Sequence, residues 1–346
     1  MPNIKEISKL AGVSTATVSN VLNNSPKVTV ETREKVLKVI QETQYHPNTI
    51  AKSLKVKRTN TIGVISEDIT VFNTPDIIDG IDEYTENWGF HIILNNLRLY
   101  KRLGNHYSQT PKYRALIADT VQILLNRQVD GMIYIGAHSR DVSDIIGEIS
   151  VPVVYAYCYS LSGIHYSVNY DDEEGAYNAI KYLIGHGHSK IGVISGLYDS
   201  FQSQARFKGY QRALYEYNLL FNPAYLKAGN WEQESGYLLG KELLSLPDRP
   251  TAIFAMNDLM AGGVFDAAGE LGISIPGELS LVGFDNRDCS KFFVPRLTTM
   301  GLPLNEIGKK AAEIIIHLIT DPPVNGEMKD YRLNCQLVER QSVASI

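Results

Sequence analysis

Apolar side chains recur at helical spacing through the first 45 residues, as expected for helices that each bury one face. Three stripes follow one another: Ile4, Ile7, Leu10 and Ala11, then Val18, Val21 and Leu22, then Val36, Leu37 and Ile40. Gly12 separates the first two stripes and can adopt the positive φ of a tight turn. Asn3, Ser14 and Thr29 precede the stripes and are expected to cap the helices. The pattern predicts a three-helix head over residues 1–47, ended by Pro47.

From residue 61 onward, short apolar runs alternate with stripes at helical spacing. The runs predict strands at 61–65, 91–94, 132–135, 151–155, 191–194, 251–255 and 280–282. The stripes predict helices at 77–88, 206–217, 232–246 and 258–271. Strands that alternate with helices form parallel sheets with helices on both faces. We therefore expect the body, residues 61–346, to have a doubly wound α/β fold.

A repeated segment indicates that this body has two similar lobes. The sequence IGVIS occupies residues 62–66 and recurs unchanged at residues 191–195, in both cases at the start of a set of alternating strands and helices. Lobes of this kind bind ligands at the carboxyl ends of their strands. Two lobes that face one cleft form the architecture of periplasmic binding proteins, which close about a hinge.

The charge of the head differs from that of the body. Residues 1–60 contain ten Lys or Arg and four Asp or Glu, a net charge of +6, whereas the remaining residues carry −11. This asymmetry suggests that the head alone contacts phosphate groups.

Cysteine usage and the lack of long apolar runs favour a cytoplasmic protein without membrane contact. Cys158, Cys289 and Cys335 lie far apart in the sequence and match no metal-binding or redox spacing, as expected for reduced thiols. Residues 2–5 begin no apolar signal core, and no run approaches the roughly 18 apolar residues of a membrane helix.

The second predicted helix carries side chains suited to reading DNA. When its apolar residues face the core, Thr15, Ala16, Thr17 and Asn20 face outward. Asn can bond the N6/N7 edge of adenine, and the methyl groups of Thr and Ala can contact the thymine methyl, while Thr17 can equally bind a phosphate. A helix, a glycine turn and a second helix are typical of the helix-turn-helix, whose second helix lies in the major groove. The alternative is a small bundle that binds another protein.

Residues 48–60 form a basic segment between head and body. This segment is too short for a stable isolated helix, and Leu54 lies in it among Lys52, Lys55, Lys57 and Arg58. Such a segment can fold on DNA, with Leu54 wedged between base steps in the minor groove and the lysines on phosphates. The alternative is a flexible linker.

Two of these segments resemble the lactose-repressor (lacI) family of bacterial transcription regulators, and within it the purine and galactose repressors. They are residues 11–19, AGVSTATVS, and residues 47–54, which end in AKSL. The resemblance implies base-reading positions at Thr15, Ala16 and Asn20 and a hinge helix that contacts DNA. The hinge contacts would be Ala51, Leu54 and Lys55. It also implies a homodimer on a pseudo-palindromic operator.

The resemblance extends through the body, where residues 250–261, 281–286 and 295–299 are similar to cleft-forming and crossover segments. In that fold the chain crosses three times between the lobes. Lobe 1 would then comprise about 61–158 and 293–322, and lobe 2 about 162–290 and 325–340.

The resemblance also implies a pocket for a small effector between the lobes. Its expected lining is Phe72, Asn73, Thr74, Arg206, Trp231, Asp258 and Asp285. Carboxylates accept bonds from hydroxyls, Arg206 offers a fork of donors, and Trp231 can stack on a ring, which favours a sugar or a nucleoside.

Each of these assignments has a structural alternative. Arg206 and Asp285 could form an ion pair between loops, and Trp231 could belong to the core. Asp171 and Asp172 are expected to cap the following helix rather than bind ligand.

One segment departs from the family. Residues 97–114 form a longer connection than usual, with five basic residues and no acidic residue. This segment could cover the cleft, bind an anionic ligand or simply be solvated.

Motifs for catalysis are missing from the sequence. The serine of residues 192–196 lies one place too late for a GxSxG nucleophile elbow, and His186 and His188 have the wrong spacing for a helical zinc site. An exported solute-binding protein and a sugar-processing enzyme are the rival functions, but the former needs a signal where the helix-turn-helix lies and the latter has no motif. We therefore expect a ligand-controlled repressor, with no catalytic residue, cofactor or metal.

Overall fold

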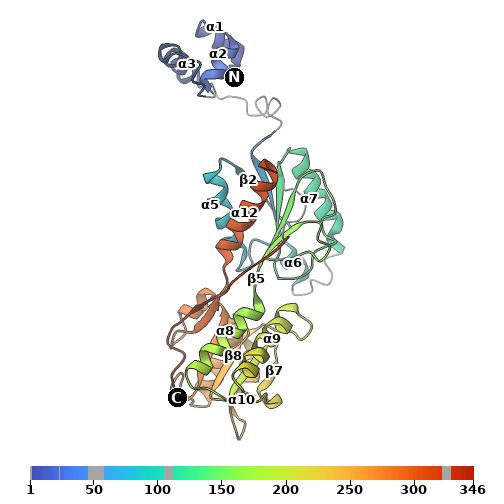
Figure 1. Ribbon diagram of the computed structural model, residues 1–346, viewed down its shortest axis with the longest axis vertical. Helices are drawn as coiled ribbons and strands as arrows, with labels where there is room; N and C mark the ends of the chain where they lie inside the picture. The colour runs from blue at the N-terminus through green and yellow to red at the C-terminus, as the bar shows by residue number, and fades with distance from the viewer. Residues whose placement is uncertain (1, 23, 46–57, 105–111, 322–328) are drawn as a thin grey trace. The chain divides into compact units, whose positions relative to one another are not determined.

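The computed structural model describes residues 2–22, 24–45, 58–104, 112–321 and 329–346, in two compact units, Met1–Thr59 and Asn60–Ile346 (Figure 1). The described part of the first unit contains helices α1 (Ile4–Leu10), α2 (Thr15–Leu22) and α3 (Val30–Thr43). The predicted caps are confirmed, since the side chains of Asn3, Ser14 and Thr29 accept backbone N–H groups of the helices that follow them. Gly12 has a φ of +62° in the turn between α1 and α2.

The core of the head is narrower than the sequence pattern predicts. Ile7, Val18 and Val36 are fully buried, but Leu10 is 62% exposed and Leu37 48% exposed, so these two predictions of core residues are wrong. Short helices in a small bundle bury a thin line of side chains, and both leucines lie beside that line. Tyr45, which follows α3 and which the pattern did not select, is buried in their place.

The second unit consists of two lobes, each built on its own sheet. Lobe 1 contains strands β1 (Thr61–Ser66), β2 (His91–Asn96), β3 (Gly131–Ile135), β4 (Val153–Ala156), β5 (Tyr166–Tyr170) and β11 (Asp330–Leu333), and helices α5 (Thr74–Asn87), α6 (Leu99–Leu103), α7 (Arg114–Asn126) and α12 (Leu304–Thr320). The strand order is β11-β5-β4-β3-β1-β2, and all pairs are parallel.

Lobe 2 repeats this plan. It contains strands β6 (Ile191–Ser195), β7 (Leu226–Ala228), β8 (Ala252–Ala255), β9 (Ser280–Asp285), β10 (Thr298–Gly301) and β12 (Gln336–Val338), and helices α8 (Asp172–Gly185), α9 (Phe201–Glu216), α10 (Gln233–Leu244) and α11 (Asp258–Glu270). Its order is β12-β10-β9-β8-β6-β7, with β12 antiparallel to its neighbour.

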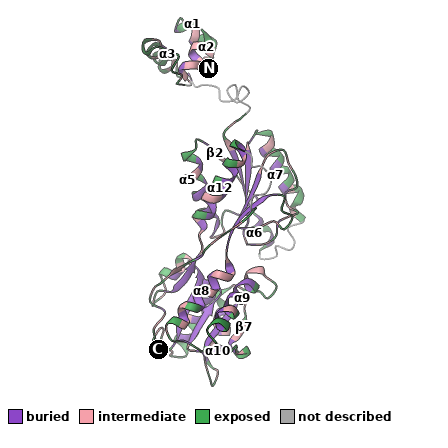
Figure 2. Ribbon diagram, in the orientation of Figure 1, coloured by how far each residue is buried: buried purple, intermediate pink, exposed green. Residues whose placement is uncertain are grey.

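The repeated IGVIS segment marks equivalent strands, as predicted. Both copies, β1 and β6, lie second from one edge of their sheets. The next strands toward the centre of each sheet, β3 and β8, are buried along their length, whereas the edge strand β2 is partly exposed (Figure 2). Sheets covered on both faces explain the continuous apolar runs in the sequence.

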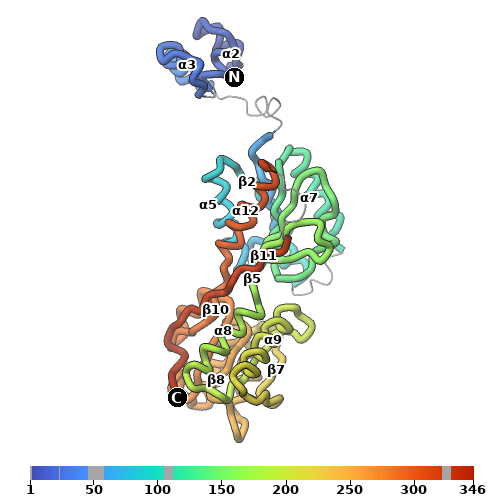
Figure 3. The backbone as a smooth tube through the Cα atoms, in the orientation of Figure 1, coloured from blue at the N-terminus to red at the C-terminus, as the bar shows by residue number. Residues whose placement is uncertain are grey.

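The chain crosses between the lobes three times, after β5, after β10 and between β11 and β12 (Figure 3). Sheet membership moves the predicted lobe boundaries: β5 and β11 belong to lobe 1, and β10 belongs to lobe 2. The predicted boundaries were the approximate ones that the family resemblance implies, but each of these strands completes the sheet that it pairs with before the chain crosses over.

Part of the basic connection 97–114 is structured. Leu97, Leu99 and Leu103 are buried, and the backbone N–H groups of Leu97 and Leu99 donate to the carbonyls of Ser66 and Glu67. The described residues 97–104 therefore pack on the end of β1. Arg114 forms an ion pair with Asp144, while residues 105–111 lie outside the described residues.

Glycines allow helices to pack backbone against backbone in each lobe. A Cβ atom on Gly308 of α12 would lie 2.1 Å from the carbonyl oxygen of Ile77 in α5, and one on Gly80 of α5 would lie 2.0 Å from that of Asn305. Between α10 and α11 the corresponding residue is Gly263, 2.1 Å from the carbonyl oxygen of Gln233. An added methyl group would therefore push the helices apart.

Gly308→Ala is expected to lower the free energy of unfolding by about 1–3 kcal/mol, because the backbone atoms that the methyl group meets cannot rotate away. Chemical denaturation of the full chain measures this change. Gly269→Ala is the matched control, since its Cβ would meet nothing within 4 Å in α11, and we expect it to be neutral or stabilising. An equally stable Gly308→Ala protein would contradict the close packing.

Candidate functional site

The first candidate site is the start of α2 in the head. Thr15 and Ala16 are exposed there, while Thr17 and Asn20 are partly buried. The hydroxyl groups of Thr17 and Ser14 lie 2.9 Å apart, so Thr17 is engaged with the helix cap. The structure thus presents Thr15 and Ala16 most openly for base contact. The hinge residues Ala51, Leu54 and Lys55 lie outside the described residues.

The second candidate site lies where the two lobes face each other. The carboxyl end of β5 in lobe 1 leads directly into α8 of lobe 2, and the carboxyl end of β10 in lobe 2 leads back into α12 of lobe 1. Because all other strands of each sheet core run parallel to these two, the carboxyl ends of both sheets point toward the opposite lobe, and we call the region between them the cleft. This is the position at which α/β sheets bind ligands.

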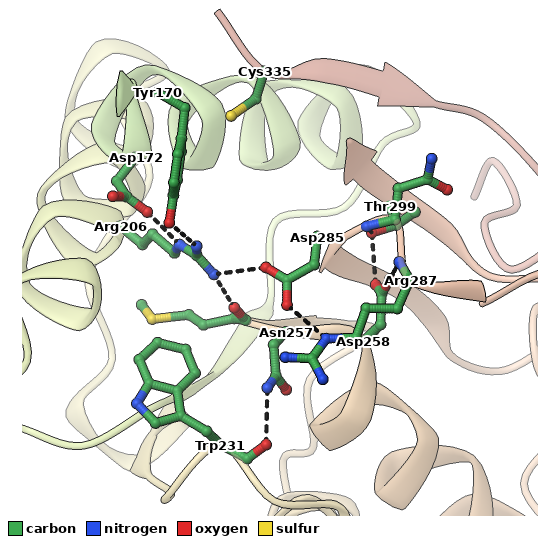
Figure 4. A network of polar contacts seen from close by, with 12 residues as sticks. Tyr170, Asp172, Arg206, Trp231, Asn257, Asp258, Asp285, Arg287, Thr299 and Cys335 are labelled. Atoms are coloured by element: carbon green, nitrogen blue, oxygen red, sulfur yellow. Dashed lines mark hydrogen bonds and ion pairs between the residues drawn. The ribbon is translucent and has the colours of Figure 1, made fainter. Parts of the chain in front are cut away.

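Arg206 of α9 is buried at the lobe 2 side of this cleft (Figure 4). Its Nε donates to Asp172 at 2.7 Å, its Nη2 donates to the hydroxyl of Tyr170 at 3.2 Å, and its Nη1 lies 3.7 Å from Asp285. Nη1 also donates to the carbonyl of Met256. The ion-pair alternative for Arg206 and Asp285 is therefore realised in this structure, and most of the guanidinium's donors are in use.

Asp172 has a different role from the one predicted. Asp171 caps α8, as expected, by accepting the N–H group of Glu174 at 2.9 Å. Asp172, the first residue of the helix, is instead buried against Arg206. Burial raises the pKa of Asp172 to about 6, an effect that the Arg206 guanidinium opposes.

Asp258 and Asp285 both accept hydrogen bonds from Arg287. Asp258 is fully buried, accepts from the Thr299 hydroxyl at 2.6 Å and accepts from the backbone N–H of Arg287 at 2.7 Å. Burial, and then the nearby charge of Asp285, raise the pKa of Asp258 to about 8. Asp285 accepts from Nε of Arg287 at 3.1 Å, and burial raises its pKa against the pull of Arg287 and Arg206. Direct contact of Asp258 with an effector stays a prediction; its present contacts support the position of Arg287.

Trp231 lies over the backbone of lobe 2 at the end of β6. A Cβ atom on Gly196 would lie within 2 Å of the indole ring, so the ring needs a glycine beneath it. The ring centroid is 5.7 Å from Cζ of Arg206, and the backbone carbonyl of Trp231 accepts from Asn257 at 2.8 Å. Trp231 is partly exposed, which leaves ring surface for a ligand.

Some residues near this cleft have unusual backbone conformations, as do others elsewhere in the body, among them Gln128 and Asn218. Asp285, Trp231 and Tyr157 have φ values of +105°, +76° and +60°, in the region that favours glycine. Such conformations cost free energy and persist where surrounding contacts fix them, most often at functional sites. Asp285 ends β9 and Tyr157 follows β4, while Trp231 lies in the loop after β7.

Lobe 1 contributes the loop between β1 and α5. The ring of Phe72 is partly exposed and lies beneath the guanidinium of Arg287, with 4.0 Å between Cζ and the ring centroid. Asn73 and Thr74 are buried: Asn73 donates to the carbonyl of Gly136, and Thr74 donates to that of Asp68. Oδ1 of Asn73 has no hydrogen-bond partner within the described part of the chain.

Sequence reasoning missed several residues of the cleft. Arg287, Tyr170 and Asn257 were not selected, although Arg287 and Asn257 adjoin strand ends that were recognised. In lobe 1, Glu67 is buried and binds Arg140 at 2.9 Å and the Tyr134 hydroxyl at 2.6 Å. Position directly after a parallel strand is the signal that could have found Glu67.

Among the described residues, no group of three or more His, Cys, Asp or Glu side chains could hold a metal ion. His188 is buried and hydrogen-bonded to the hydroxyl groups of Thr251 and Ser280. Cys158, Cys289 and Cys335 are free thiols, as the sequence predicts. Among these residues no helix is long and apolar enough to span a membrane.

Comparisons with known proteins agree with this architecture. Residues 3–48 match the model of bacterial regulatory proteins of the lacI family, and residues 180–343 match a periplasmic binding protein-like domain. The chain is 33% identical over 351 residues to the HTH-type transcriptional repressor PurR of Vibrio vulnificus, and 32% identical over 348 residues to that of Pasteurella multocida. The alignments cover 100% of this chain and at least 99% of each relative.

Solved structures show the same fold. A structure of the lac repressor dimer bound to operator and the anti-inducer ONPF has a TM-score of 0.78 with 24% identity, covering 99% of both chains. A complex of the regulator CelR with cellobiose has a TM-score of 0.64 with 26% identity, covering 99% of this chain and 100% of CelR. With a helix-turn-helix head, a two-lobed body and relatives similar along its whole length, this chain belongs to the lacI family of bacterial regulatory proteins and is a DNA-binding transcriptional repressor, not an enzyme.

Proposed function

We propose that this repressor binds its operator with an affinity set by a small effector in the cleft between the lobes. The observation that carries the proposal is the cluster of Arg206 from α9, Asp285 at the end of β9 and Trp231 from the loop after β7. Carboxylate, guanidinium and indole are the groups that bind the hydroxyls and ring faces of sugars and nucleosides. The similar regulator CelR has been solved with cellobiose, and a family member from Enterococcus faecium with ribose.

Arg206 connects the cleft to the first crossover between the lobes. Arg206 binds both Tyr170 at the end of β5 and Asp172 at the start of α8, which are the residues on either side of the first crossover. An effector that draws Asp285 or Arg206 toward itself therefore changes the contacts that fix this crossover. A change in lobe orientation that alters the hinge segments would link effector binding to operator affinity, and such linkage acts in both directions.

We infer that the operator is a pseudo-palindrome bound by a homodimer in the cytoplasm. A single helix-turn-helix reads a short half-site, and dimers read two half-sites about one helical turn apart. The similar lac repressor was solved as a dimer bound to operator. On each half-site, Thr15, Ala16 and Asn20 are proposed to read bases, Thr17 to bind near a phosphate, and Leu54 with Ala51 and Lys55 to enter the minor groove.

Asn20→Ala is expected to weaken binding to the selected operator about 10- to 100-fold, since one bidentate base contact is worth about 1–3 kcal/mol of discrimination. Binding to scrambled DNA should stay unchanged. Fluorescence anisotropy with both DNAs measures the two affinities. Gln41→Ala, an exposed change on α3, is the control. An equal loss on both DNAs would show that Asn20 does not read bases.

Asp285→Asn is expected to reduce effector affinity about 10-fold or more, because hydrogen bonds to a charged group contribute about 1.5–3 kcal/mol. A thermal-shift screen of the full chain with ribose, cellobiose and adenosine identifies the ligand class, since ligands that bind the folded state raise its melting temperature. The variant should lose the shift, and Asp119→Asn, an exposed change on α7, should keep it. A retained shift in Asp285→Asn would place the effector elsewhere.

A further inference from the structure

Arg287 connects the two lobes across the cleft. It follows β9 of lobe 2, and its guanidinium lies over the ring of Phe72 in the β1–α5 loop of lobe 1, with 4.0 Å between Cζ and the ring centroid. At this distance the cation is attracted by the ring face, with a strength of about 0.5–2 kcal/mol depending on solvent exposure. The side chain is 25% exposed, so the contact is partly desolvated.

Two contacts of lobe 2 and the local backbone conformation hold Arg287 in this position. Asp285 accepts from Nε at 3.1 Å, and the buried Asp258 accepts from the backbone N–H at 2.7 Å. Asp285 and Asn286, the two residues before it, have φ values of +105° and +57°. Lobe 2 therefore fixes the direction of this side chain toward lobe 1, and the contact with Phe72 is not the chance position of a solvated arginine.

The terminal nitrogens of Arg287 have no hydrogen-bond partner among the described residues, in contrast to those of Arg206. Near this loop, Oδ1 of the buried Asn73 also lacks a partner. A flat guanidinium on a ring face occupies the same surface that a flat ligand would use. Arg287 thus fills the stacking surface of Phe72 and joins the lobes at the same time.

We propose that Arg287 is a latch that joins the two lobes across the cleft without effector, and that an effector must displace its guanidinium from Phe72 or bond to its free nitrogens. The latch depends on the proposed function in one respect, namely that the effector binds in the cleft. It predicts that the affinity of the cleft for a ligand is set by competition with a residue of the chain itself. An effector with acceptor oxygens beside its ring would bind most tightly, because those oxygens can accept hydrogen bonds from the guanidinium nitrogens of Arg287.

Hydrogen–deuterium exchange of the full chain, without DNA or effector, tests the latch. In Arg287→Gln, peptides over residues 66–74 of the opposite lobe should exchange about 2- to 30-fold faster, the range that corresponds to losing a cation–π contact. Phe72→Leu should accelerate peptides over residues 285–292 in the same range while leaving the pair of Arg287 with Asp285 intact. The double variant should exchange no faster than the faster single variant, since both changes remove one contact.

Arg212→Gln is the matched control. Arg212 stacks on Tyr177 with 3.8 Å between Cζ and the ring centroid, but both residues lie in lobe 2. Its loss should accelerate exchange in α8 and α9 and leave residues 66–74 unchanged. Unchanged exchange of residues 66–74 in Arg287→Gln, or fully additive effects in the double variant, would overturn the latch. Neither result would bear on whether the cleft binds an effector, since no ligand is present in the experiment.

Discussion

The body depends on one buried cation, the guanidinium of Arg206. A charge removed from water is very costly unless it is paired and hydrogen-bonded, so its partners must stay in place. Those partners are Asp172, Tyr170, the carbonyl of Met256 and, at longer range, Asp285. They come from the ends of β5, β8 and β9 and from the start of α8, so one side chain joins both lobes, the first crossover and the cleft.

This arrangement separates rigid parts of the molecule from movable ones. Within each lobe, helices pack backbone to backbone at glycines such as Gly308 and Gly263, where no side chain can adjust. Close-packed interiors change between discrete arrangements rather than deforming continuously. Motion is therefore expected between the lobes, at the crossovers, where Arg206 and Arg287 make polar pairs and ring contacts.

Local patterns predicted most of the fold. Helical spacing, glycine turns and capping residues act between neighbours in sequence, so α1 to α3 follow from them directly. Apolar runs likewise predicted β1 to β4, β6, β8 and β9, but not β5, β7, β10, β11 and β12. The IGVIS repeat revealed two lobes because equivalent strands face equivalent packing constraints. Leu10 and Leu37 were misplaced because periodicity defines a face but not how much of it the neighbouring helices cover.

The site was less predictable, because its contacts join residues that are distant in sequence. Arg206 and Asp285 were selected through family resemblance and strand-end position, and the structure brings them together. Asp171 occupies the N-cap of α8, so Asp172, one residue later, is not at the capping position and instead compensates the buried charge of Arg206. Arg287 and Phe72 meet across the cleft from opposite lobes, and no spacing rule connects them.

The central claim is that cleft occupancy sets operator affinity. Its most direct test is an anisotropy titration of the full chain on its selected operator, at zero and at saturating concentration of a ligand that stabilises the protein. The account predicts a change in operator Kd of about 5- to 150-fold, with the same factor in ligand affinity when operator is bound. An operator Kd that stays the same at saturating ligand would contradict it.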